Sequence, residues 1–133
     1  MTWNIDQERA CDLDLDEVLE VYRSSGLGER RPVTDTERFA AMVRNANLII
    51  TCRIDGTLVG IVRSISDFSY VTYLSDIAVS GPHQRSGIGR ALIDATQKVA
   101  PQAKIVLLSA PAAIDYYPHI GFSRHDSAWV LNP

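Results

Sequence analysis

Cysteine is scarce in this 133-residue chain, which contains only Cys11 and Cys52. Two isolated cysteines exclude a disulfide framework, and their spacing does not match that of metal ligands. No apolar run approaches the ~20 residues of a membrane-spanning helix, and the N-terminus lacks the basic and apolar regions of a signal peptide. We therefore expect a soluble protein in a reducing cytoplasm, without a bound metal ion.

An excess of positive charge is also missing, because the formal net charge is −3 and the pI is near 5.5. This charge argues against general nucleic-acid binding, whereas a mildly acidic surface suits a cationic amine. Hydrophobic residues make up 46% of the chain and charged residues 22%, as is usual for a globular protein. Because no linker, repeat or low-complexity tract divides them, residues 1–133 are predicted to form a single domain.

A glycine-rich loop between a predicted strand and a predicted helix is the most informative stretch. Residues 84–89 read Gln-Arg-Ser-Gly-Ile-Gly. One face of the helix that follows carries apolar residues at a spacing of three and four, namely Ile88, Ala91, Leu92, Ala95 and Val99. The first N–H groups of a helix lack internal partners and lie at the positive end of its dipole. Together with the glycines, and with Arg85 and Arg90 nearby, they predict a phosphate site.

Two common phosphate loops do not fit these residues. A P-loop requires Lys-Ser/Thr after its last glycine, whereas Gly89 is followed by Arg90 and Ala91. A dinucleotide fingerprint requires a third glycine, and this position is Leu92. The pattern Gln84-x-x-Gly87-x-Gly89 instead resembles the acyl-CoA-binding motif of the GNAT superfamily of N-acetyltransferases. The alternative is a glycine-rich strand–helix turn that binds no ligand.

A second segment supports this resemblance. Residues 113–122 read Ala-Ile-Asp-Tyr-Tyr-Pro-His-Ile-Gly-Phe. They are similar, at every fixed position, to the Ala-x-x-Phe/Tyr-Tyr-x-x-x-Gly-Phe segment of GNAT proteins. One departure lies before the loop, where Gly81 stands in the place of a frequent proline and Pro82 follows. Since the spacing from Val79 to Gln84 is kept, we expect a slightly altered loop with the same binding function.

The order of the predicted elements is also that of the GNAT fold. We expect helices that start at the capping boxes Asp14-x-x-Glu17 and Thr34-x-x-Glu37. Strands are predicted at residues 3–5, 48–54, 57–66, 70–79 and 105–109, a short helix at 112–120, and one or two short strands within 122–131. The resemblance implies an α+β fold with a central mixed, mostly antiparallel sheet and about four flanking helices. In this fold one parallel strand pair splays apart to leave a slot for the cofactor.

The resemblance implies that acetyl-CoA is the co-substrate. It implies that one strand pairs its backbone with the pantetheine arm, that the loop holds the pyrophosphate, and that one Ser touches the cofactor arm. The strand residues are Ile77, Ala78 and Val79, the loop residues are Gln84, Arg85, Ser86, Gly87, Ile88, Gly89 and Arg90, and the serine is Ser109.

The implied reaction is direct attack of a neutral primary amine on the thioester, with both substrates bound together. Tyr117, four residues before Gly121, holds the place of the family's usual proton donor to the leaving thiolate. A packed ring with a bonded hydroxyl is the alternative interpretation, and Pro118 weakens the helix directly after it. Tyr116, where the family accepts Phe, is expected mainly to pack.

A base must take the proton of the ammonium group, directly or through water. Asp76 is the first candidate, and a structural carboxylate or a substrate anchor is the alternative. Strand alternation predicts that Leu74, Asp76 and Ala78 share one face and that Ser75, Ile77 and Val79 share the other. Asp67 and Glu29 are weaker candidates for the base, and His83 and His119 are expected at the surface.

Three function classes can be compared. An N-acetyltransferase explains both motifs, whereas a non-catalytic acyl-CoA-binding regulatory module needs only the slot and the loop. A nucleic-acid-binding protein using the Gln84–Ala100 helix conflicts with the net charge and with the apolar face of that helix. The acceptor amine is not specified, although residues 24–32 and 67–70 are predicted to line its pocket. The resemblance also implies a possible homodimer.

Overall fold

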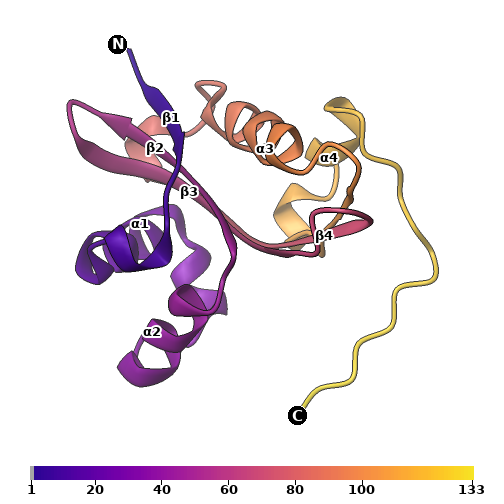
Figure 1. The fold of residues 1–133 in the computed structure, drawn as a ribbon, viewed down its shortest axis with the longest axis horizontal. Helices are drawn as coiled ribbons and strands as arrows, with labels where there is room; N and C mark the ends of the chain where they lie inside the picture. Colours follow the sequence, from indigo (N-terminus) through magenta and orange to yellow (C-terminus); the bar gives the residue numbers. More distant parts are fainter. Residues whose placement is uncertain (1) are drawn as a thin grey trace.

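A five-stranded sheet in the order β1-β2-β3-β4-β5 forms the centre of the computed structural model, which describes residues 2–133 (Figure 1). Its strands are β1 (Asn4–Gln7), β2 (Leu48–Ile54), β3 (Thr57–Ser66), β4 (Val71–Val79) and β5 (Lys104–Val106). The first four strands pair with one another in antiparallel fashion, and β5 runs parallel to β4. The predicted bounds of β2 and β3 are confirmed, and Asp55 and Gly56 between them both have positive φ, as expected of this hairpin turn.

Two helices, α1 (Leu15–Ser25) and α2 (Thr36–Arg44), precede the hairpin. The Asp14 carboxylate accepts a hydrogen bond from the N–H of Asp16 at 2.9 Å and so caps α1 as predicted. The cap of α2 is Asp35, which accepts from the N–H of Arg38 at 3.1 Å. The predicted cap at Thr34 is therefore one residue too early, because the neighbouring carboxylate reaches the first-turn N–H groups instead.

The sheet separates two apolar clusters. The α3-side core lies under α3 (Ile88–Val99) and includes Leu48, Ile50, Val59, Val62, Leu74, Leu92 and Ile93. The α1/α2-side core on the other face includes Val18, Tyr22, Phe39, Val43, Ile49, Ile61 and Ala78. A methyl group built on Gly60 of β3 would lie 3.1 Å from Ile88 Cγ2 and 3.2 Å from Leu92 Cδ1. The bare glycine therefore lets α3 pack directly on the sheet.

A β-bulge interrupts β4. Arg63 of β3 lies opposite Asp76 and Ser64 lies opposite Leu74, so Ser75 is the extra residue. The bulge reverses the alternation of the β4 side chains, because Leu74 packs in the α3-side core and Ala78 in the α1/α2-side core. The prediction that Leu74, Asp76 and Ala78 share one face is therefore wrong, since simple alternation contains no bulge.

The parallel strands β4 and β5 pair only where Val71–Tyr73 face Lys104–Val106. The strand β5 ends at Val106 rather than at the predicted residue 109. Beyond this point β4 continues to Val79, with β3 on one side and no strand of residues 2–133 on the other. The expected GNAT arrangement, a mixed α+β fold with one parallel pair that separates toward the glycine loop, is therefore present.

The C-terminal region departs most from expectation. The predicted helix over 112–120 is a 3-10 turn at Pro111–Ala113 followed by α4 (Tyr116–His119). The short strands predicted within 122–131 are absent, because this tail runs extended without a paired strand within residues 2–133. Figure 1 shows the tail curving away from the sheet. No helix among residues 2–133 combines the length and apolarity that a membrane span requires.

Candidate active site

The loop between β4 and α3 is tied to the first helix through polar contacts. The N–H of Gly81 donates to Ser24 Oγ at 3.0 Å. The side-chain amide of Gln84 donates to the carbonyl oxygen of Val79 at 2.9 Å and to that of Ser25 at 3.3 Å. Gln84, predicted from sequence to bind the cofactor, thus joins the end of β4 to the end of α1. Its side chain fixes the position of the loop.

The loop before α3 contains two left-handed residues. Arg85 and Gly87 have φ values of 62° and 91° and are therefore left-handed. Left-handed residues that alternate with right-handed ones point neighbouring N–H groups toward one point, which is a favourable anion site. The N-cap residue Gly87 offers no side-chain acceptor to the first turn of α3, so those N–H groups remain open to a ligand. Residues 85–90 thus lie at the start of α3, and their role as a phosphate site stays a prediction.

The hydroxyl of Tyr116 lies beside the first turn of α3. A methyl group built on Gly89 would meet the Tyr116 hydroxyl oxygen at 3.4 Å. The absence of a side chain at Gly89 therefore lets the phenol approach the first turn of α3. Sequence reasoning treated Tyr116 as a packing ring and missed this position, because only the fold brings α4 beside α3.

Tyr117 is half-buried against the α3-side core. Its ring makes edge contacts with the ring of Tyr116 at 5.3 Å and with that of Phe122 at 5.4 Å between centroids. Burial, and then the neighbouring Tyr116, raise the pKa of the Tyr117 hydroxyl, so this group is protonated at neutral pH. Burial and Tyr116 act on that hydroxyl without any hydrogen bond to it among residues 2–133. A protonated, unengaged phenol is suited to donate a proton.

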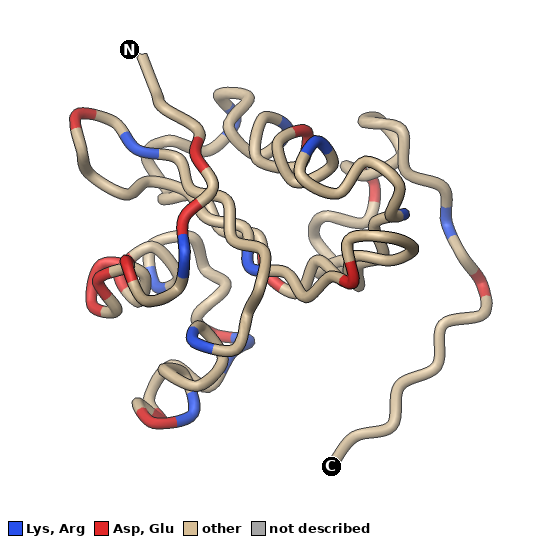
Figure 2. Tube along the Cα trace, in the orientation of Figure 1, with Lys and Arg blue, Asp and Glu red and all other residues tan. Residues whose placement is uncertain are grey.

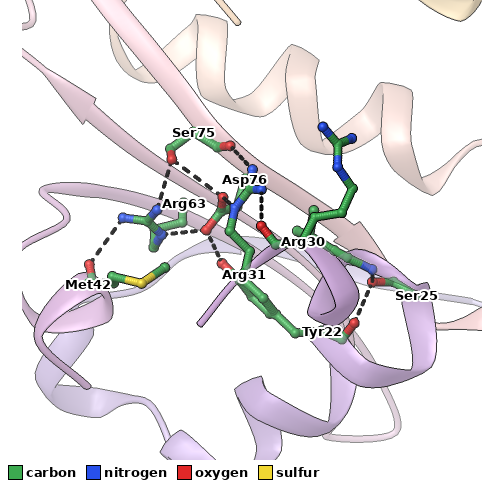
Figure 3. Close-up of polar contacts among 9 residues, drawn as sticks. Tyr22, Ser25, Arg30, Arg31, Met42, Arg63, Ser75 and Asp76 are labelled. Carbon is green, nitrogen blue, oxygen red and sulfur yellow. Dashed lines mark hydrogen bonds and ion pairs between the residues drawn. The ribbon is translucent and has the colours of Figure 1, made fainter. Parts of the chain in front are cut away.

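Asp76 lies at the centre of a buried ionic cluster (Figure 3). Its carboxylate accepts hydrogen bonds from Arg31 Nε, Arg63 Nε and the Tyr22 hydroxyl, each at 2.6 Å. Burial alone would raise the pKa of Asp76, but the hydrogen bond and charge of Arg63 lower it below its usual range, with further help from Tyr22 and Arg31. A carboxylate held by two guanidinium groups is a poor proton acceptor at neutral pH.

The same two arginines also hold the bulge of β4. Arg31 donates through Nη2 to the carbonyl oxygen of Ser75 at 3.0 Å, and Arg63 donates through Nη2 to Ser75 Oγ at 2.8 Å. Arg63 further donates to the carbonyl oxygen of Met42 at 3.2 Å. These bonds satisfy backbone and side-chain groups that the bulge removes from regular pairing. The cluster therefore fixes the segment of β4 that leads to the loop.

Comparison with known proteins decides the family. The model of the Acetyltransferase (GNAT) family matches residues 15–122, which include the β4 edge, the loop and both tyrosines of α4. The chain belongs to the GNAT acetyltransferase family.

Solved structures agree on the fold of this GNAT protein. A GNAT-family acetyltransferase from Streptococcus pneumoniae has a TM-score of 0.77 and 18% identity, covering 99% of this chain and 100% of that one. An aminoglycoside N-acetyltransferase in complex with CoA has a TM-score of 0.73 and 15% identity, covering 99% and 95%. An aminoglycoside acetyltransferase from an uncultured soil metagenomic sample, in complex with sisomicin, gives 0.71 and 18%, covering 98% and 95%.

The weaker candidates for the base in this GNAT chain have other surroundings. Asp67 accepts from the N–H groups of Ser69, Tyr70 and Val71 at 2.7 to 3.0 Å, and these backbone bonds lower its pKa. Its carboxylate thus closes the turn before β4. Glu29 is exposed in the 3-10 turn Leu27–Arg30, and His119 is exposed in α4. Neither residue is brought to the β4 edge by a described contact.

Besides Tyr116, sequence reasoning missed the three partners of Asp76, namely Tyr22, Arg31 and Arg63. Arg63 offered a usable signal in the sequence, because it stands within the apolar strand Thr57–Ser66. In the structure its side chain is only 7% exposed. A buried arginine requires an anionic partner, so its position in β3 predicts a carboxylate nearby. No comparable signal marks Tyr22 and Arg31, which reach the cluster only through the packing of α1 and the turn after it.

Proposed function

We propose that this GNAT protein transfers an acetyl group from acetyl-CoA to a primary amine by direct attack in a ternary complex. The observation that carries the proposal is the unpaired edge of β4 beside the uncapped N-terminus of α3. A splayed strand has N–H and C=O groups that need partners, and the pantetheine arm supplies them. A similar fold solved in complex with CoA supports the same choice of cofactor.

Binding of the cofactor divides between two segments. The backbone of Ile77–Val79 pairs with the pantetheine arm, and the N–H groups of residues 85–90 hold the pyrophosphate at the start of α3. Ser109, half-buried in the segment after β5, lies on the opposite side of the parallel pair and is proposed to touch the arm. The exposed guanidinium groups of Arg85 and Arg90 add positive charge beside the phosphates.

The chemistry follows from the thioester. The amine nitrogen bonds to the carbonyl carbon, the carbon–sulfur bond breaks, and the thiolate takes a proton from the Tyr117 hydroxyl. The buried and protonated state of Tyr117 supports this role. Because both Asp76 oxygens are already engaged, we assign Asp76 to holding β4 in place. The nitrogen, which became cationic on attack, releases its proton through water to the Tyr117 phenolate and so restores the phenol.

An amine screen tests the proposal. Release of free CoA thiol from acetyl-CoA is measured with a panel of polyamines, amino acids, aminoglycosides and peptide N-termini. Thiol release that depends on one amine class supports the transferase. Cofactor binding without thiol release from any amine supports the alternative, a non-catalytic acyl-CoA-binding regulatory module.

A further inference from the structure

The ionic cluster around Asp76 contains more positive than negative charge. Its one carboxylate accepts hydrogen bonds from two guanidinium groups, those of Arg31 and Arg63, so one positive charge remains in excess. The side chain of Arg31 is 24% exposed and that of Arg63 is 8% exposed, which removes the excess charge partly from water. Because a partly buried charge without a counter-charge is unfavourable, the cluster is suited to receive one further anion.

Arg31 retains N–H donors for such an anion. A guanidinium has five N–H donors, two of them on each Nη. Arg31 donates from Nε to Asp76 and once from each Nη, to the carbonyl oxygens of Arg30 and Ser75. One N–H on each Nη is thus without a described partner among residues 2–133. Arg30 is exposed, and Figure 3 shows its guanidinium extending away from Asp76 without a marked contact. Two adjacent arginines therefore offer donors beside β4.

Few acidic side chains compete for these donors. Asp76 is the only acidic residue of β3, β4 and β5. Glu29 belongs to the same turn as Arg30, but it is exposed and makes no described contact with the cluster. Even when Glu29 is counted, three guanidinium groups of Arg30, Arg31 and Arg63 face two carboxylates. A surface with this balance attracts an anion and repels a polycation.

Next to the cluster, the same face of the sheet is apolar and exposed. Alternation along β3 places Ile65 on the face of Arg63. Ile65 lies opposite Tyr73 of β4, and Tyr73 lies opposite Val106 of β5. These three residues, the apolar row, are 51%, 38% and 43% exposed. Only two residues of strand, ~7 Å, separate Tyr73 from Ser75, which both cluster arginines contact.

We propose that the acceptor of the proposed transferase is an amine that also carries a carboxylate and an apolar side chain, as an apolar α-amino acid does. The carboxylate accepts hydrogen bonds from Arg30 and Arg31, and the side chain covers the apolar row. The amine then lies beside the bulge of β4. All three groups of an α-amino acid are attached to one carbon, which suits the short distance between the arginines and the row. Binding gives the excess positive charge its anion and removes the row from water.

A matched pair of amines tests the carboxylate. L-phenylalanine and L-phenylalaninamide share the amine and the side chain, but only the first is an acid. Thiol release from acetyl-CoA gives kcat/KM for each compound. The amide has the less basic amine and thus more of the reactive neutral form, so a preference for the acid must arise from binding. We expect kcat/KM to be about tenfold higher for the acid or more, since hydrogen bonds between charged groups are strong.

The outcomes separate this inference from the proposed function. Equal values, a preference for the amide, or turnover of polyamines alone would overturn the inference and leave the transferase in place. Thiol release with no amine at all, despite cofactor binding, would overturn both.

Arg30→Gln tests the exposed arginine, because its side chain makes no described contact in the cluster. The acid-to-amide ratio of kcat/KM is expected to fall about two- to fivefold, the range for an exposed ion pair. Arg9→Gln is the matched control, since it removes the same charge just after β1, with β2 and β3 between β1 and β4. An unchanged ratio for Arg30→Gln, or an equal fall for Arg9→Gln, would overturn the assignment of the carboxylate to this turn.

Tyr73→Ser tests the apolar row without changing any charge. The ratio of kcat/KM for L-phenylalanine over glycine is expected to fall about two- to tenfold, because an aromatic contact is lost. Trp129→Ser is the control, since it removes an aromatic ring that is 93% exposed in the tail, and it should keep the ratio. If Tyr73→Ser alters the circular dichroism, Ile65→Ser provides the same measurement. A parent-like ratio in the folded row variants would overturn the apolar part of the proposal.

Discussion

At the scale of single residues, Asp76 has the most demanding environment. It is 1% exposed and Arg63 is 7% exposed, so the burial of each charge is tolerated only because the other is present. Burial alone would lower the pKa of Arg63, but its bond to Asp76 raises it above the ordinary value. Burial, and then the charge of Asp76, raise the pKa of Tyr22 far above its ordinary value, so its phenol remains a donor. The cluster is therefore charged and fully bonded at neutral pH.

We predict that Asp76→Asn destabilises the protein by about 3–5 kcal/mol, because it leaves two arginines without their anion. Urea unfolding of the variant and the parent measures the difference. Asp94→Asn is the control, since Asp94 is exposed and its Arg90 partner is 4.0 Å away; it should change stability by less than about 0.5 kcal/mol. An unchanged midpoint for Asp76→Asn would contradict the charged cluster.

The same cluster predicts a pH dependence. The pKa of Asp76 is lower in the folded state than the ~3.9 of an unfolded chain. Its stabilisation is therefore fully present above pH ~4 and is lost as the pH falls through the folded pKa. Melting temperatures between pH 6 and pH 2 should fall more steeply for the parent than for Asp76→Asn. Parallel curves would show that Asp76 is not charged in the fold.

Tyr117→Phe is predicted to lower kcat while leaving acetyl-CoA affinity nearly unchanged. General-acid catalysis typically raises the rate by ~10²–10⁴-fold. Because a thiolate is already a good leaving group, we expect Tyr117→Phe to lower kcat by about 10²-fold or less. Steady-state rates and cofactor titration measure the two effects. Tyr116→Phe is the contrast, because its hydroxyl lies beside Gly89 and should affect cofactor affinity more than kcat. Equal kcat for Tyr117→Phe and the parent, when chemistry limits the rate, would remove the acid role.

At the scale of elements, the start of α3 depends on its loop. The helix has no side-chain cap at its N-terminus, which ordinarily costs stability. The open N-terminus is then available to an anionic ligand. The backbone there is left-handed at Gly87, a conformation that side chains disfavour. The proposed binding surface would thus come at a cost in local stability of the loop and the helix.

Gly87→Val is predicted to abolish acetyl-CoA binding, because a branched side chain is strained at φ 91° and stands in the phosphate site. Gly56→Val is the matched control. Gly56 has φ 80° in the β2–β3 turn and open space around it, so a valine there imposes similar strain outside residues 84–89. Both variants should lose about 1–3 kcal/mol of stability, but only Gly87→Val should lose cofactor binding in titration calorimetry. Parent-like binding by Gly87→Val would show that the phosphates bind elsewhere.

At the scale of the whole molecule, charge is spread without a basic face. Figure 2 shows Lys and Arg residues distributed over several elements, with acidic residues concentrated at α1. The formal net charge of −3 likewise gives no support to nucleic-acid binding. The proposed phosphate recognition therefore relies on the local loop and the helix N-terminus, and the proposed cationic amine would meet a mildly acidic protein.

Acetyl-CoA is predicted to raise the melting temperature. A ligand at 100 times its Kd adds about 2.7 kcal/mol of stability when it binds only the folded state, which corresponds to roughly 10 °C for a chain of this size. Thermal denaturation with and without the cofactor gives the shift, and Gly87→Val should not show it. The absence of a shift at millimolar acetyl-CoA would contradict the proposed binding site.

The sequence by itself determined the features that depend on neighbouring residues. The Asp55-Gly56 turn, the cap at Asp14 and the left-handed Gly87 all follow from local backbone preferences. The bounds of β2 and β3 follow from the periods of their apolar residues. Both GNAT motifs are also contiguous in the chain, so the family and its mixed fold can be identified from the amino-acid order alone.

Only the tertiary structure decided the environment of Asp76. Its partners Tyr22 and Arg31 are 54 and 45 residues away in sequence, and the bulge at Ser75 arises from pairing with β3. Such contacts reflect the packing of distant segments, and local propensity contains no information about which distant segments meet.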